Sequence, residues 1–192
     1  MAGLGVGLAL SLKFAGILSA YVALTVAYTL WLKHQPVLDI AVVASGFVFR
    51  AVAGGVATTI PLSQWFLIVT AAGSLFIVAG KRHAEFVEMG EGRGATRTSL
   101  LGYSLAYLRY VWMLASAVGI VAYCLWAFEQ SRGRGFPWFE LSIVPFVIAI
   151  LHVELRFARG QGGAPEEMAL RDRTLQVLGA VWVALVVVGI YS

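Results

Sequence analysis

Long apolar runs separated by short polar segments constrain this chain more than any other feature. A helix needs roughly 17–25 residues to cross a bilayer, and six runs approach or exceed that length: residues 14–32, 37–59, 63–79, 100–128, 138–157 and 175–191. Charged residues make up only 12% of the chain, whereas soluble domains carry about 25%. Since backbone groups at membrane depth must be paired within their own segment, the runs predict helices. The sequence therefore predicts an all-α, polytopic transmembrane helical bundle, a single domain over residues 1–192.

A seventh apolar run at the N-terminus, residues 2–12, is too short to span a membrane. As a helix it would cover about 17 Å, roughly half of the hydrocarbon thickness. No basic segment precedes it, as a signal peptide would require. The expected fold is thus six full spans after a partial one, with the domain incomplete at its N-terminus.

Basic residues are distributed unequally between the two sets of connecting segments. If the spans alternate in direction, one face carries nine of them: Lys33, Lys81, Arg82, Arg93, Arg97, Arg156, Arg159, Arg171 and Arg173. The other face carries only Lys13, Arg132 and Arg134. Cytoplasmic loops are enriched in Lys and Arg, so we expect the first face to be cytoplasmic and the protein to lie in the cell membrane. The net charge of +4 then reflects topology, and we expect no nucleic-acid partner.

The most polar stretch, residues 80–98, follows directly on the third span. Lys81 and Arg82 are suited to bind phosphate, one as a point charge and the other as a bidentate fork. Glu85 lies four residues after Lys81, on the same face if the helix continues, and could orient Lys81 or hold a metal ion. The alternative is that these cations are ordinary topology signals. His83 has no second ligand at metal-binding spacing, which favours a polar interface residue.

Ionisable residues also occur inside the predicted spans. Arg50 lies in mid-span between Gly46 and Gly54, where small residues would let a neighbouring helix approach. An arginine at this depth is predicted to face the bundle interior, either in interhelical hydrogen bonds or in the wall of an anion-binding cavity. Glu154, near the end of the fifth span, is expected to pair with a basic neighbour such as Arg156.

Several blocks of the sequence resemble a known family when they are taken together. They are Tyr28-Thr-Leu-Trp-Leu-Lys33, Asp39, Gly46-Phe-Val-Phe-Arg50-Ala-Val-Ala-Gly54, Gly80-Lys-Arg-His-Ala-Glu85 and the loop from Gly162 to Gln176. They are similar to the UbiA-type intramembrane prenyltransferase superfamily, and within it to the actinobacterial group that transfers phosphoribose to decaprenyl phosphate. The resemblance extends over essentially the whole chain.

The resemblance implies a nine-helix fold around a cavity that opens to the cytoplasm, of which this chain would supply the third helix in part and the fourth to ninth. It implies Mg²⁺ as cofactor, bound mainly by an aspartate-rich motif that this chain lacks. A second aspartate motif of most members is replaced here by Lys81-Arg82-His83-Ala84-Glu85. Glu85 is the weak candidate metal ligand, no catalytic residue is assigned, and the candidate substrate-binding residues are Lys33, Asp39, Arg50, Lys81, Arg82 and Arg97.

The implied reaction is transfer of 5-phosphoribose from phosphoribosyl diphosphate to a polyprenyl phosphate, for arabinan precursor synthesis in the cell wall. The expected partners are these two substrates and membrane lipid, with a homo-oligomer left open. Two alternatives remain: a prenyltransferase of the same fold acting on an aromatic acceptor, and an inactive, truncated membrane protein. Product analysis with each donor separates the first alternative from the leading one.

Overall fold

The computed structural model describes residues 12–89, 102–133, 135–161 and 164–192, and all regular structure in these ranges is helical. The elements are listed here in chain order: α2 (Leu12–Leu30), the 3₁₀ turn η1 (Leu32–His34), α3 (Leu38–Thr58), α4 (Gln64–Met89), α6 (Leu105–Ser131), α7 (Trp138–Leu141), α8 (Ile143–Ala158), α9 (Pro165–Arg171) and α10 (Arg173–Tyr191). The predicted all-α fold is confirmed.

Five helical segments are long and apolar enough to cross a membrane: Leu38–Thr58, Gln64–Glu88, Leu105–Ser131, Trp138–Ala158 and Arg173–Tyr191. A sixth apolar helix, Phe14–Leu30, is shorter. These six segments correspond to the six predicted full spans. The predicted partial span at residues 2–12 lies outside the described residues.

Two predicted boundaries were wrong. The third span was expected to end at residue 79, but α4 continues without a break to Met89. Lys81, Arg82 and Glu85 therefore lie on a helix and not in a loop, since nothing between residues 79 and 89 breaks the helix. Helix α6 begins at Leu105, later than the expected residue 100, because the Ser104 side chain caps it by accepting a hydrogen bond from the Tyr107 N–H.

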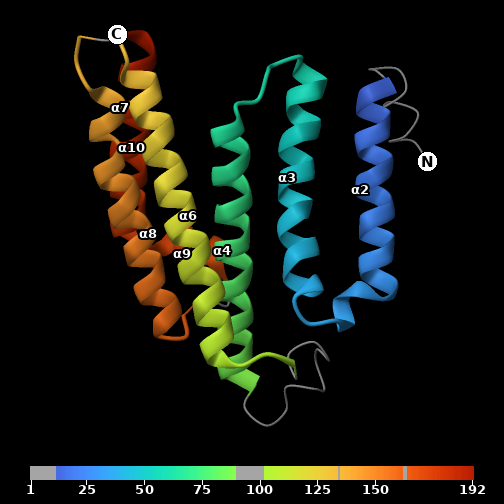
Figure 1. Ribbon diagram of the computed structural model, residues 1–192. Coiled ribbons are helices and arrows are strands. Elements are labelled where there is room, and N and C mark those ends of the chain that lie inside the picture. The colour runs from blue at the N-terminus through green and yellow to red at the C-terminus, as the bar shows by residue number, and fades with distance from the viewer. Residues whose placement is uncertain (1–11, 90–101, 134, 162–163) are drawn as a thin grey trace.

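Helix α4 occupies the centre of the bundle, with α3 on one side and α6 on the other, and α2 lies outside α3 (Figure 1). Its packing against α6 is the most extensive in the protein. Aromatic side chains fill the centre of this packing. The centroid of the Phe157 ring lies 5.0 Å from that of Phe76 and 5.5 Å from that of Trp112. Large buried rings contribute much of the packing energy in such a core, so these three rings join α4, α6 and α8.

The ends of the helices separate into two groups. One end of the bundle holds η1, the C-terminal end of α4 and the C-terminal end of α8 (Figure 1). The turn between α3 and α4, the α6–α7 connection and the end of α10 lie at the opposite end (Figure 1). This grouping agrees with the predicted alternation of the spans.

Candidate functional site

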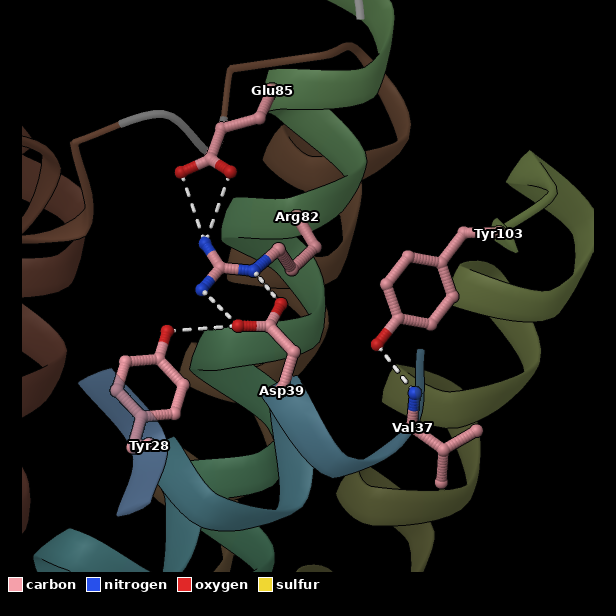
Figure 2. Close-up of polar contacts among 6 residues, drawn as sticks. All are labelled: Tyr28, Val37, Asp39, Arg82, Glu85 and Tyr103. Atoms are coloured by element: carbon pink, nitrogen blue, oxygen red, sulfur yellow. Dashed lines mark hydrogen bonds and ion pairs between the residues drawn. The ribbon is translucent and has the colours of Figure 1, made fainter. Parts of the chain in front are cut away.

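Four polar side chains meet between α2, α3 and α4, and we call them the Arg82 cluster: Tyr28, Asp39, Arg82 and Glu85 (Figure 2). Asp39 lies in the first turn of α3, where the positive end of the helix dipole favours a carboxylate. Arg82 and Glu85 are three residues apart on α4, which places them on the same helical face. The sequence named three of these four residues as candidates, and the structure brings all three together.

The geometry of the Arg82 cluster fixes the guanidinium on two sides. Arg82 Nε donates to Asp39 Oδ2 at 2.7 Å, and Nη2 donates to Asp39 Oδ1 at 3.3 Å. Nη1 donates to both carboxylate oxygens of Glu85, each at 3.0 Å. The hydroxyl of Tyr28 donates to Asp39 Oδ1 at 2.8 Å. Asp39 is fully buried and Arg82 is only 4% exposed, so the fork is held in one orientation.

This arrangement changes the roles that the sequence suggested for residues 81–85. Glu85 contacts Arg82, where the sequence had suggested that it might orient Lys81. Lys81 itself is half-buried and forms no ion pair with another described residue. Of these two cations, Arg82 is therefore held in place by carboxylates, and a ligand-binding role of Lys81 stays a prediction.

A cleft of about 690 Å³ opens beside the Arg82 cluster, with Glu85 in its wall. The ends of α4 and α8 and the short helix α9 enclose it, through polar residues that include Glu88, Arg156, Gln161 and Arg171. A second, smaller cavity of about 300 Å³ lies between α2 and α3 and is lined by Tyr28 and Arg50. The Arg82 cluster thus borders two cavities.

Arg50 lies in the wall of the second cavity and is exposed in this chain. Its Nη2 donates to the Tyr21 hydroxyl at 3.0 Å, and its guanidinium carbon lies 5.7 Å from the centre of the Tyr21 ring. The interhelical hydrogen bond that the sequence offered as one explanation is present. An anion-binding role stays a prediction.

The remaining sequence candidates are not part of the Arg82 cluster. Lys33 is half-buried on η1, and Arg97 lies outside the described residues. His83 is buried as an interface residue, with its ring 4.6 Å from that of Trp112 and its Nδ1 without a hydrogen-bond partner among the described residues. The expected pairing of Glu154 with a basic neighbour was wrong, because Glu154 accepts a hydrogen bond from Ser116.

A second polar group joins α8 to the start of α10, and the sequence did not single it out. Asp172 Oδ2 lies 2.8 Å from His152 Nε2 and 2.5 Å from Arg156 Nη2. Its Oδ1 caps α10 by accepting from the Thr174 and Leu175 N–H groups. The hydrogen bond with His152, followed by those with Arg156 and the backbone, holds the pKa of Asp172 well below its usual value. An Asp just before an apolar run is a helix-start signal, which could have revealed it.

The described residues do not form a metal site by themselves. None of their His, Cys, Asp and Glu side chains gather in a group of three or more that could hold an ion. Both oxygens of Glu85 face the Arg82 guanidinium, which leaves a poor environment for a cation. The magnesium expected from the resemblance therefore stays a prediction and would need ligands from beyond these residues.

Comparison with known proteins identifies a set of relatives. The chain is 46% identical over 191 residues to the decaprenyl-phosphate phosphoribosyltransferase of Mycolicibacterium smegmatis, a match that covers 95% of this chain. The proteins of the same name from Corynebacterium glutamicum and Mycobacterium tuberculosis are 48% and 49% identical over 92% and 91% of the chain. The resemblance to decaprenyl-phosphate phosphoribosyltransferases is confirmed.

The likeness covers nearly all of this chain but only part of each relative. The chain spans 60% of the M. smegmatis protein, 54% of the C. glutamicum protein and 57% of the M. tuberculosis protein. No family model matches the chain. The six residues from Gly80 to Glu85 lie on α4, one of the helices long and apolar enough to cross a membrane.

Proposed function

We propose that this chain is part of a membrane phosphoribosyltransferase that moves 5-phosphoribose from phosphoribosyl diphosphate to decaprenyl phosphate. The observation that carries the proposal is the 46–49% identity, over more than nine tenths of the chain, to proteins named for this activity. The charge arrangement at the end of α4 supports it, since cations there can contact phosphate oxygens. The product would serve arabinan precursor synthesis, as the resemblance implies.

In the proposed reaction a phosphate oxygen of the lipid attacks the anomeric carbon of the ribose. A new C–O bond forms there as the bond from that carbon to the diphosphate breaks, and the diphosphate leaves with the bonding electrons. Lys81 is suited to contact the departing charge, because it is half-buried and has no carboxylate partner among the described residues. Arg82, held by Asp39 and Glu85, would shape the wall beside it.

An apolar groove of about 410 Å³ between α2, α3 and α4 supports the lipid part of the proposal. Its lining is almost entirely aliphatic or aromatic and includes Ile17, Val48, Phe49 and Leu75. A polyprenyl chain needs such a surface, since it gains free energy only by contact with apolar groups. The cell membrane as location, the cytoplasmic orientation of Lys81 and self-association remain predictions that go with this proposal.

The decisive experiment measures transfer of label from phosphoribosyl diphosphate to decaprenyl phosphate. It would use the chain alone and the chain fused to the region of the M. smegmatis relative outside the matched part, each in detergent with Mg²⁺. We expect a labelled lipid product from the fused protein at least, and about a 10- to 100-fold lower donor affinity in its Lys81→Ala variant. The intact relative is the positive control.

Other outcomes would decide against the proposal. A prenylated product from a prenyl diphosphate and an aromatic acid, with no labelled lipid phosphate, would favour the aromatic prenyltransferase. Lack of any product from both proteins, while the intact relative is active, would favour the inactive membrane protein.

A further inference from the structure

The turn before α3 is the least ordinary piece of backbone near the Arg82 cluster. Val37 has φ 69° and ψ −51°, and the Leu38 N–H donates to the Pro36 carbonyl at 2.8 Å. Together these define a γ-turn of the rare positive-φ type. A β-branched residue in this region is strained, so a surrounding contact must hold the turn in place.

Two residues at the start of α6 supply that contact. The Tyr103 hydroxyl accepts a hydrogen bond from the Val37 N–H at 2.7 Å (Figure 2). Gly102 packs so closely on Pro36 that a Cβ added there would lie 2.2 Å from the proline Cγ. The Tyr103 ring is 6% exposed and packs in the cluster that contains Ile40 and Leu108. The turn is thus fixed from the α6 side by a buried phenol.

The Val37 turn also sets the position of Asp39 in the first turn of α3. Asp39 is two residues after Val37, and its carboxylate makes close contacts with Tyr28 and Arg82 at 2.7–2.8 Å. A relaxed turn would move the first residues of the helix and lengthen those contacts, and hydrogen bonds weaken steeply with distance and misalignment. Arg82 would then lose the partner that orients its Nε edge.

We infer that Tyr103 is a positioning residue, which holds the Val37 turn so that Asp39 can orient Arg82 at the donor site. Only the assignment of Arg82 to a donor site rests on the proposed function. The series of contacts from Tyr103 through the Val37 turn and Asp39 to Arg82 is independent of it. Burial raises the pKa of Tyr103 to about 12, so the phenol stays neutral over the working pH range.

The test compares Tyr103→Phe, which removes only the hydroxyl, with Tyr110→Phe, an exposed tyrosine seven residues further along the chain in α6. The first readout is hydrogen–deuterium exchange of the backbone amides of residues 37–41 in detergent. We expect exchange about three- to tenfold faster in Tyr103→Phe and unchanged in Tyr110→Phe. Equal exchange in the two variants would overturn the inference.

The second readout uses the fused, active protein. Tyr103→Phe should raise the KM for phosphoribosyl diphosphate roughly three- to tenfold with little change in kcat, and should have no further effect in an Asp39→Asn background. Val37→Gly should reduce the effect of Tyr103→Phe, since glycine adopts positive φ without strain. Additive effects of Tyr103→Phe and Asp39→Asn would contradict the positioning role. Lack of transfer by the unmodified fused protein would refute the proposed function alone, because the exchange result decides the role of Tyr103 independently.

Discussion

Asp39 of α3 and Arg82 of α4 form the least solvent-exposed ion pair among the residues that the structure describes. They are 43 residues apart in the sequence, and their contact joins two membrane helices at the end that also carries Glu85. Two carboxylates contact the Arg82 guanidinium, Asp39 through Nε and Nη2 and Glu85 through Nη1. Under the proposed function, Arg82 would shape the wall of the site and Lys81 would contact the phosphate.

Removing the guanidinium should affect stability as well as binding. We expect Arg82→Ala to lower the free energy of unfolding by about 3–5 kcal/mol, because it removes the guanidinium that pairs with the fully buried Asp39 carboxylate. Chemical denaturation in detergent would measure this. Lys81→Ala is the matched control and should stay within about 0.5 kcal/mol of the unmodified protein. A stable Arg82→Ala protein with only weaker donor binding would contradict the structural role.

Gly80 should not tolerate a methyl group. A Cβ at this position would lie 2.1–2.4 Å from atoms of the Phe157 ring, which is fully buried. We expect Gly80→Ala to destabilise the protein by about 1–3 kcal/mol through overpacking. Gly73 lies on the same helix with nothing within 4 Å of its added Cβ, so Gly73→Ala should be neutral or stabilising by up to about 1 kcal/mol. Thermal unfolding of both variants tests the contrast, and equal effects would exclude close packing at Gly80.

The Asp172 contacts should make stability depend on pH in a defined direction. The pKa of Asp172 is lowered in the folded protein, so its contribution is present above the unfolded pKa of about 4 and is lost as the pH falls through the folded value. We expect Asp172→Asn to be less stable at pH 7, and the difference from the unmodified protein to shrink on acidification below about pH 4. Melting curves between pH 7 and pH 3 measure this. A difference that grows on acidification would contradict the ion pair.

The two ends of the bundle should be accessible from opposite sides of the membrane. With Cys124 replaced by alanine, a cysteine at position 33 or 159 should resist a membrane-impermeant maleimide in intact cells and react after permeabilisation. A cysteine at position 132 should react in intact cells. The predicted cytoplasmic orientation follows from the excess of basic residues, and the reverse labelling pattern would refute it.

The number and order of the membrane helices could be predicted from the sequence, whereas the residues at which individual helices begin and end could not. The apolar runs determined which segments are helices, since only helices satisfy the backbone in a bilayer. The end of α4 was misplaced because charged residues were taken as the limit of the helix, yet a helix can extend into water without a break. The structure describes α4 as far as Met89, and Phe86 near that point packs in a buried cluster with Ile40 and Leu108, a tertiary contact that no local pattern reveals.

The sequence predicted most of the residues of the candidate site but not which of them contact one another. Asp39, Arg82 and Glu85 were all named, because acids and bases near a membrane surface stand out in an apolar chain. Which carboxylate faces which cation depends on how α3 and α4 pack. Tyr28 and Tyr103 were missed as site residues because a tyrosine carries no charge at neutral pH, and its hydroxyl becomes important only when a distant partner is brought to it.

The close contact between Gly80 and Phe157 limits how this protein could be redesigned. Gly80, Lys81 and Arg82 follow one another within a single turn of α4. The residue that packs against α8 and the residues proposed to form the substrate site therefore share one stretch of backbone. Substitutions at positions 81–85 therefore cannot be combined freely with changes on the α8 side. An engineer would have to vary both helices together, treating Gly80 as invariant and screening Phe157 jointly with Lys81.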